Sequence, residues 1–323
     1  MDLLGRVRDQ DLLSGDVLVM LSGGRDSVCL LDLATRLPGV SGVRAVHVDH
    51  GTGAHAREQE ARCRALCQEL NVALTVERLG PAPAGNRHDG WRRRRLAAAA
   101  RHLGGGGARV ALGHTASDQA ETILYRLAAS PGRRALLGME ALQALPTEHG
   151  PVVVLRPLLG CTRDETAAHC RTRGLSWGED PGNDDRAFAR SRVRHELLGA
   201  LRAVHPAAEA NVLETAAVLR DEAVVLEVVV GAARAACAGA AGEVLLEPLA
   251  AQPAAVRRLV LQRLADEAVA AARPSGARAP ALRRREAELM ALARTGRATA
   301  LDLGGGLRAV AERGALRFEA EPA

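Results

Sequence analysis

The sequence predicts an α/β protein: a Rossmann-like parallel sheet with helices on both faces, followed by a mainly helical second domain with a small β tail. Two observations carry this prediction. In the first half, short apolar runs alternate with segments of helical periodicity, which is the βαβ pattern of a parallel sheet. From about residue 162 the helical pattern dominates, and strand-like runs return only near the C-terminus.

The strand-like runs of the first half end in polar residues. Five strands are expected, at residues 16–21, 44–50, 73–79, 109–114 and 151–158, and the segments between the first four are helical in pattern, for example 58–70 and 91–103. Runs that are apolar on both faces belong in a parallel sheet covered by helices, and ligands bind such sheets beyond the carboxyl ends of the strands. Polar residues gather there at Ser22–Ser27, Asp49, His50, 114–121 and Arg156.

The second half is helical in character. Thr162 is expected to cap a helix that Gly174 ends, and the turn-rich stretch 179–185 is expected to be a loop. Residues 189–235 are almost continuously helical in pattern, two more helices are expected at 254–272 and 282–294, and 298–321 resembles short strands separated by glycine turns. We therefore expect a first domain of residues 1–200 and a second domain of residues 201–323.

Length and composition indicate a soluble globular protein. The 323 residues are 47% apolar, which is enough for two cores. No segment reaches the roughly 18 consecutive apolar residues of a membrane helix, and the N-terminus lacks the apolar stretch of a signal peptide, so a cytoplasmic location is expected. The six cysteines show no CxxC spacing, which indicates buried thiols rather than a metal cluster.

The charge is unevenly distributed. All 43 basic residues are arginine, and the net charge of +5 comes from residues 251–323, which hold 13 arginines and 8 acidic residues. Each guanidinium is a planar fork that grips phosphate through two hydrogen bonds. A polyanionic partner is therefore expected for the C-terminal part, although a solvated basic face is nearly as good an explanation.

The stretch Ser22–Ser27 follows the first expected strand directly. Gly23 and Gly24 allow positive φ and expose consecutive backbone N–H groups, and the next helix adds its positive end, so this corner is suited to hold a phosphate. Asp26 would need a cation between itself and phosphate, which suggests Mg²⁺. The Gly-Lys-Ser/Thr ending of the ordinary P-loop is missing. A plain glycine turn before a capped helix remains an equal alternative for this stretch alone.

Two further groups of residues favour a functional site. Asp118 and Glu121 are three residues apart at the start of an expected helix, where they satisfy the helix dipole or form a pocket for a cationic amine. Arg92 and Arg95 share one helical face, while Arg190, Arg192 and Arg194 are expected to alternate before a helix starts. Such arginine runs are usually solvated, but here we favour phosphate contacts for some of them.

These motifs carry a family resemblance. The loop SGGRDS is similar to the pyrophosphatase loop of the N-type ATP pyrophosphatases, the PP-loop superfamily, which split ATP between the α and β phosphates. HVDHG, GHTASDQAET, RPLL and EDPGNDDRAFARSRVRHELLGAL resemble motifs of the tRNA(Ile)-lysidine synthetases. The resemblance spans residues 18 to about 205 and continues weakly to the C-terminus. It implies an adenine nucleotide hydrolase-like fold and the family's short form, without an additional C-terminal domain.

The resemblance implies a two-step ligation of free L-lysine to C2 of the wobble cytidine in tRNA(Ile) with a CAU anticodon. ATP would adenylate the C2 oxygen with release of pyrophosphate, and the lysine ε-amine would displace AMP. ATP and Mg²⁺ are the implied cofactors, with Asp26 as the tentative metal ligand. The implied catalytic residues are Asp26, Asp118 and Glu121; the ATP-binding residues are Ser22, Gly23, Gly24, Arg25, Asp26, Ser27, His50 and His114; the tRNA-binding residues are Arg92, Arg95, Arg190, Arg192 and Arg194.

Some positions depart from the family pattern, and some questions stay open. The departures are Gly182, Ser191 and Gly199, together with His88 and Leu96 around the arginine helix, and they affect the expected tRNA contacts more than the ATP chemistry. The alternatives are a tRNA thiolation enzyme on the same ATP core and a non-catalytic adenine-nucleotide sensor. The oligomeric state is open, with a homodimer as one alternative, as are the basis for rejecting tRNA(Met) and the choice of carboxylate as base.

Overall fold

The computed structural model describes residues 2–49, 54–80, 87–103, 109–130, 132–178, 189–273, 278–292 and 298–322. Its contacts divide the chain into two compact units, Met1–Leu219 and Arg220–Ala323. The expected division after residue 200 remains a prediction. None of the helices in the described ranges combines the length and apolar character that a membrane span requires.

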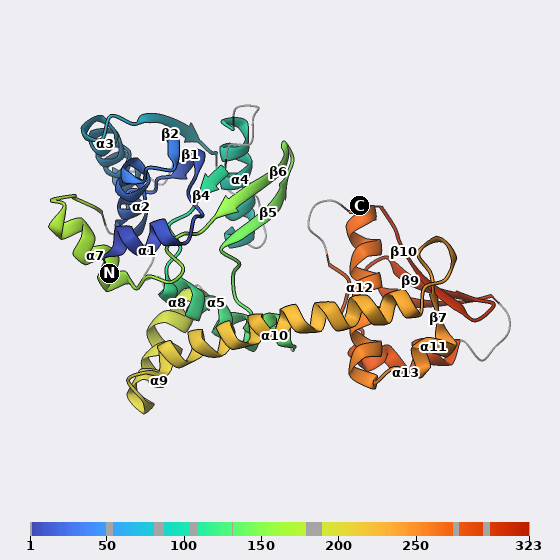
Figure 1. The fold of residues 1–323 in the computed structure, drawn as a ribbon. Coiled ribbons are helices and arrows are strands. Elements are labelled where there is room, and N and C mark those ends of the chain that lie inside the picture. The colour runs from blue at the N-terminus through green and yellow to red at the C-terminus, as the bar shows by residue number, and fades with distance from the viewer. Residues whose placement is uncertain are drawn as a thin grey trace. The chain divides into compact units, whose positions relative to one another are not determined.

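The first unit contains a six-stranded sheet (Figure 1). In spatial order its strands are β3 (Ala73–Arg78), β2 (Val40–Asp49), β1 (Gly15–Met20), β4 (Arg109–Ala111), β6 (Gly150–Leu155) and β5 (Leu142–Thr147). Neighbouring strands are parallel except for β5, which pairs antiparallel with β6. The five expected strands are confirmed. The sequence reading missed β5, a half-exposed edge strand whose Pro146 weakens its strand pattern.

Helices cover both faces of this sheet, as expected. The first unit contains α1 (Leu3–Asp9), α2 (Arg25–Arg36), α3 (Ala54–Glu69), α4 (Arg87–Arg101), α5 (Ala116–Ala129), α6 (Arg133–Leu136), α7 (Arg163–Thr172), α8 (Ala189–Arg192) and α9 (Leu198–Val204). Residues of α5 and α9 pack together in a separate small cluster. Val17 and Val19 of β1 pack into one core with α2 and α7, whereas Leu18 packs into another with α4. Alternate side chains of a strand point to opposite faces, so β1 contributes to both cores.

Two helix starts differ from expectation. Helix α2 begins at Arg25, two residues earlier than the expected start near Ser27. The predicted start of a helix after Arg194 is wrong, because α8 already contains Arg190 and Arg192, and a π-helical turn at Val193–Leu197 contains Arg194. The helical pattern of 189–235 is interrupted near Pro206 before α10 (Ala208–Ala236), since proline lacks the N–H that continues a helix.

The predicted ends of α7 are confirmed. Thr162 is its N-cap, and the Thr162 hydroxyl accepts a hydrogen bond from the Glu165 backbone N–H. The Glu165 carboxylate in turn accepts from the Thr162 N–H at 2.7 Å, which completes a capping box. Gly174 follows with φ +68°, the left-handed conformation that commonly ends helices.

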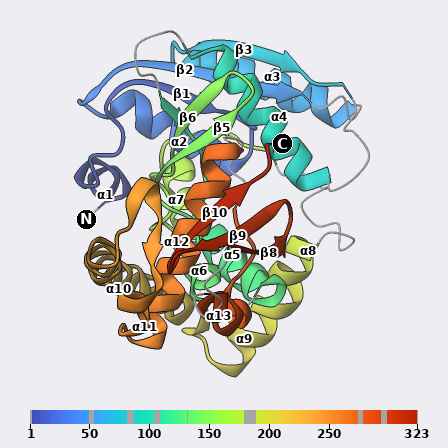
Figure 2. The same cartoon turned by 90° about the vertical axis from the view of Figure 1, so that its right-hand side faces the viewer.

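The second unit combines helices with a small antiparallel sheet (Figure 2). The C-terminal part of α10 is joined by α11 (Leu246–Ala250), α12 (Ala254–Ala272) and α13 (Glu286–Ala291). The sheet has the order β7 (Val244–Leu245), β10 (Ala315–Ala320), β9 (Leu307–Glu312) and β8 (Thr299–Gly304). Leu261, Leu307 and Leu316 are among its fully buried core residues. The predicted helical second part with a β tail is confirmed.

Candidate functional site

The glycine loop joins β1 to α2 at the carboxyl end of the sheet. Gly23 has φ +81°, and Gly24 is the N-cap of α2, so no side chain covers the N–H groups of the first helical turn. The hydroxyls of Ser22 and Ser27 lie 3.0 Å apart, and Ser27 also donates to the Gly24 carbonyl at 2.8 Å. The loop is therefore held open by its own hydroxyls and presents backbone donors at a helix N-terminus, which suits an anion.

Two glycines and a histidine from neighbouring segments pack against the glycine loop or contact its carbonyl groups. A Cβ atom on Gly113 would lie 2.9 Å from the Asp26 carbonyl carbon and oxygen, so only glycine fits there without a shift of the loop. The Gly178 N–H donates to the Gly23 carbonyl at 2.9 Å. Nδ1 of the buried His47 lies 2.8 Å from the Leu21 carbonyl oxygen. The sequence analysis placed Gly113 within the expected strand 109–114 and did not predict these supporting contacts.

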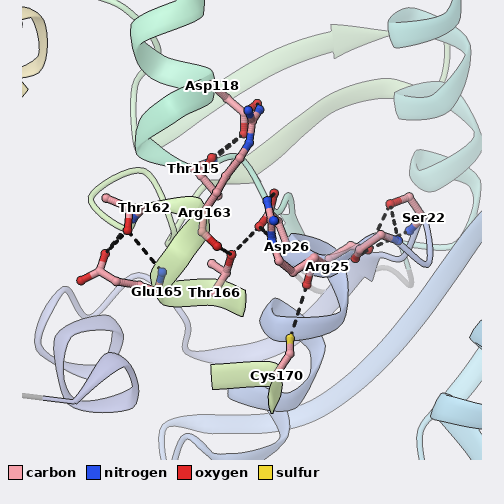
Figure 3. A network of polar contacts seen from close by, with 12 residues as sticks. Ser22, Arg25, Asp26, Thr115, Asp118, Thr162, Arg163, Glu165, Thr166 and Cys170 are labelled. Carbon is pink, nitrogen blue, oxygen red and sulfur yellow. Dashed lines mark hydrogen bonds and ion pairs between the residues drawn. The ribbon is translucent and has the colours of Figure 1, made fainter. Parts of the chain in front are cut away.

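Asp26 lies in the first turn of α2, and its carboxylate contacts two side chains (Figure 3). The Thr166 hydroxyl donates to Asp26 Oδ1 at 2.5 Å, and Arg25 Nε donates to the same oxygen at 3.0 Å. The Asp26 side chain remains 20% exposed. Thr166 lies on α7, so a helix that was expected only as a capped structural element contributes directly to the loop site.

Asp118 and Glu121 lie near the N-terminus of α5, as expected, but two arginines already bind them. Arg163, the first residue of α7, approaches Asp118 Oδ1 at 2.8 Å and Glu121 Oε1 at 3.2 Å. Arg194 donates from Nε to Glu121 Oε1 at 2.7 Å and from Nη2 to Oε2 at 3.2 Å. The Asp118 Oδ2 atom accepts from the N–H and the hydroxyl of Thr115, each at 2.8 Å. The two carboxylates and two guanidiniums together carry no net charge.

The electrostatic surroundings keep Asp118 ionised. Burial by itself raises the pKa of the Asp118 carboxyl, but the Arg163 guanidinium, His114 and the hydrogen bonds from Thr115 outweigh it and lower the pKa. Arg163 connects this carboxylate pair to the loop, because Arg163 and Thr166 lie one turn apart on α7 (Figure 3). Sequence reasoning missed both residues, since the start of α7 had been interpreted only as a helix cap.

Two of the expected tRNA-binding arginines, Arg95 and Arg190, lie near His114 together with Arg156. The pKa of His114 is lowered to about 4, chiefly by burial; Asp118 opposes the shift, and the neighbouring Arg156, Arg95 and Arg190 add to it. The buried His114 Nδ1 has no hydrogen-bond partner among the described residues. Burial also lowers the pKa of Arg156 to about 10, with a contribution from Arg92. A neutral imidazole surrounded by guanidiniums is an environment that favours an anion.

The remaining expected residues lie elsewhere or outside the described ranges. Arg194 binds Glu121, and Arg192 lines a shallow groove with Tyr125 and Glu196. His50, Gly182 and the side chain of His88 lie outside the described residues. Of the other departures, Leu96 is buried in the core under α4, Ser191 is buried, and Gly199 has open space around it.

Comparisons with known proteins agree with this architecture. The family model of the PP-loop domain matches residues 7–201. The tRNA(Ile)-lysidine synthase of Streptomyces coelicolor is 40% identical over 264 residues, covering 78% of this chain and 72% of that protein. The Pseudomonas fluorescens enzyme of the same name is 38% identical over 206 residues, covering 63% of this chain and 46% of that protein. This chain thus spans about half the length of the Pseudomonas relatives.

A solved structure shares the fold. The U34-tRNA thiolase NcsA from Methanococcus maripaludis superposes with a TM-score of 0.53 at 18% identity, covering 67% of this chain and 78% of that chain. Fold and loop together define a PP-loop nucleotide-binding protein. Within that class, the chain belongs to the tRNA(Ile)-lysidine synthase family.

Proposed function

We propose that this protein ligates free L-lysine to C2 of the wobble cytidine in tRNA(Ile) with a CAU anticodon. The cytidine O2 atom attacks the α-phosphorus of ATP and pyrophosphate leaves. The deprotonated lysine ε-amine then attacks C2, the C2–O bond breaks and AMP leaves. The observation that carries this proposal is the connection of a phosphate-binding loop to a buried carboxylate pair through a single helix, in a chain of this family.

The loop residues are proposed to hold the pyrophosphate part of ATP. Ser22 and Ser27 offer hydroxyls, and the first turn of α2, which no side chain caps, offers backbone N–H donors. Donors fixed before the reaction stabilise charge that develops on the leaving group. His114 is neutral at pH 7 because its pKa is about 4, so it contributes a polar neutral group, not a cation, to this region.

The residues around Asp26 fit a magnesium ion that is held together with phosphate. No group of three or more metal-binding side chains occurs among the described residues. Mg²⁺ usually takes one or two carboxylates, with substrate phosphates and water completing its shell, and the partly exposed Asp26 supplies one such carboxylate. When bound, the ion would neutralise charge on the leaving pyrophosphate.

Asp118 and Glu121 are proposed to receive the amine of lysine. The side-chain amine has a pKa near 10.4 in water, so it arrives as an ammonium ion and must lose a proton before it attacks. Carboxylates attract the ammonium form and accept its hydrogen bonds. Arg92, Arg95 and Arg190 are proposed to contact anticodon-loop phosphates, while Arg192 and the basic stretch 251–323 contact other parts of the tRNA.

The thiolation alternative is less well supported by the described cysteines. Thiolation needs a reactive sulfur, and the thiolate is the reactive form. All six cysteines are buried, and burial raises the pKa of Cys63 to about 12 and that of Cys67 to about 11. The Cys63 and Cys67 thiols are therefore expected to stay protonated at neutral pH.

The test is a direct ligation assay. The purified chain is incubated with ATP, Mg²⁺, radiolabelled lysine and a CAU-anticodon tRNA(Ile) transcript, and label in the RNA, AMP and pyrophosphate are measured. We expect incorporation that disappears when the anticodon cytidine is replaced or when Glu121 is changed to Ala. Pyrophosphate release without lysine incorporation would indicate another acceptor, and neither product would favour a nucleotide sensor.

A further inference from the structure

The carboxylate pair Asp118–Glu121 is fully neutralised in this structure. Glu121, whose side chain is only 5% exposed, is held by the fork of Arg194 and also touches Arg163. Asp118 is bound by Arg163 at 2.8 Å, with Arg194 further away at 3.8 Å. A third cation that enters this group of four charges would find no free carboxylate. An ammonium ion would therefore be attracted much more strongly once one guanidinium has left.

The two arginines differ in how firmly they are held. Arg163 begins α7, whose first turn is fixed by the Thr162–Glu165 capping box. The single hydroxyl proton of Thr166 is shared between the Asp26 carboxylate and the Arg163 carbonyl, which lies 2.9 Å from Thr166 Oγ1. Displacing Arg163 would disturb the glycine loop as well. Arg163 is thus the fixed cation of the cluster.

Fewer contacts fix the position of Arg194. It lies in the π-helical turn Val193–Leu197, a helical form that is rare, poorly stabilised and frequent at functional sites. Its Nε and Nη2 contacts to Glu121 are side-chain contacts only, and its side chain keeps 27% of its surface exposed. Arg194 can therefore exchange partners without disturbing the loop or α7.

The immediate surroundings offer Arg194 another partner when a phosphate is present. Arg190, four residues earlier on the same helical stretch, lies close enough to His114 and Arg95 to lower the pKa of each. A phosphate attracted to these cations would lie beside Arg194. Guanidinium binds phosphate through the same two-point geometry that it uses with carboxylate.

We propose that Arg194 is a displaceable counter-ion of the Asp118–Glu121 pair. Its guanidinium binds Glu121 until a phosphate-bearing ligand is present. The guanidinium then binds that phosphate, and the freed carboxylate accepts a primary ammonium group. The identity of the amine as lysine rests on the proposed function. The phosphate comes from the RNA or from the nucleotide. Because binding energies are reciprocal, the phosphate ligand strengthens amine binding as much as the amine strengthens binding of the phosphate ligand.

The experiment measures lysine affinity by equilibrium dialysis with radiolabelled lysine. The wild type, Arg194→Gln and Arg202→Gln are each tested alone, with the tRNA transcript, and with an ATP analogue that resists cleavage between the α and β phosphates. Arg202 on α9 is the matched control, because it pairs with Glu209 away from the site. Separate arms for RNA and nucleotide identify which phosphate acts.

For the wild type and Arg202→Gln we expect lysine to bind about fivefold more tightly, or better, when the phosphate ligand is present. Arg194→Gln should bind lysine with the higher affinity already in its absence, and the dependence on phosphate should disappear. Arg194→Lys, which keeps the charge but loses the two-point fork, should lie between them and serves as the test if the glutamine variant does not fold.

The outcomes separate this inference from the proposed function. If the wild type forms lysidine but Arg194→Gln binds lysine no more tightly, the counter-ion role is wrong and the ligase proposal stands. If the wild type forms no lysidine but Arg194→Gln still gains lysine affinity, the counter-ion role stands with another acceptor. If no variant binds lysine in any arm, both are wrong.

Discussion

The hydroxyl of Thr166 donates a 2.5 Å hydrogen bond to Oδ1 of Asp26, which lies 140 residues earlier in the chain. Thr166 is itself fully buried. The bond fixes the orientation of the carboxylate that is proposed to face phosphate and Mg²⁺. Thr166 is therefore a positioning residue for Asp26.

Replacing Thr166 by Val should remove this bond while keeping the shape of the side chain. Hydrogen bonds to charged groups contribute about 1.5–3 kcal/mol, so we expect turnover to fall by about tenfold or more. Pyrophosphate release is measured over a range of Mg²⁺ concentrations, where the variant should need more Mg²⁺. Thr166→Ser keeps the hydroxyl and should restore both properties. An unchanged Mg²⁺ dependence in Thr166→Val would argue against the positioning role.

Replacing Gly113 by Ala should displace the glycine loop. The new Cβ would lie 2.9 Å from the Asp26 carbonyl group and 3.0 Å from the Ser27 nitrogen, and neither backbone atom can move without the loop. We expect a loss of about 1–3 kcal/mol in the free energy of unfolding, together with weaker ATP binding. Chemical denaturation with and without ATP measures both quantities.

Gly199 provides the matched control for that substitution. It lies inside α9, and a Cβ there would meet nothing within 4 Å. Alanine in a helix interior is favoured over glycine by about 0.5–1 kcal/mol, so Gly199→Ala should be neutral or slightly stabilising. Equal destabilisation by both substitutions would contradict the steric explanation for Gly113.

Replacing Asp32 by Asn should weaken the packing of α7 on α2. The Asp32 carboxylate is completely buried and is bound by His169 Nε2 at 2.8 Å and by Arg173 at 3.2 Å. Removing one partner of a buried ionic group costs about 3 kcal/mol, so the melting temperature should fall by several degrees. The exposed Asp9, which pairs with the adjacent Arg8, is the control, and Asp9→Asn should leave the melting temperature nearly unchanged.

Stability should depend on pH through His114. Its pKa is lowered from 6.5 to about 4 in the folded protein, chiefly by burial, so between these values the unfolded chain binds more protons than the folded one. Protons then favour the unfolded state, and the contribution of His114 to stability is complete above its ordinary pKa and is lost as the pH falls. Urea denaturation between about pH 7 and 4.5 should show a steeper loss in the wild type than in His114→Gln. Identical slopes would show that His114 titrates normally.

Local sequence signals predicted much of the fold. The apolar runs that form β1 and β2 are recognisable because three consecutive residues of each strand are buried, so both faces are covered. Thr162 with Glu165 is a capping pattern contained in four residues. The edge strand β5 had no such signal, because its Leu142 is exposed and its pairing with β6 depends on the rest of the sheet.

Single motifs of the site could be predicted from the sequence, but the contacts between motifs that are distant in the sequence could not. Gly23 and Gly24 stand out because glycine pairs at strand ends have a specific geometric use. That Arg163 would neutralise Asp118 was not foreseeable, since the two residues are separated by 45 positions and meet only after α5 and α7 pack at the same end of the sheet. The same holds for Arg194 and Glu121, 73 positions apart.

Helix α7 is fastened to α2 at both of its ends. Near its N-terminus Thr166 holds Asp26, and towards its C-terminus His169 and Arg173 hold Asp32. The two helices are therefore held together near both ends of α7, and the glycine loop and Arg163 lie at the same end of this helix pair. Because the Thr166 hydroxyl contacts both the Arg163 carbonyl and the Asp26 carboxylate, the first turn of α7 fixes the position of Arg163 relative to Asp26.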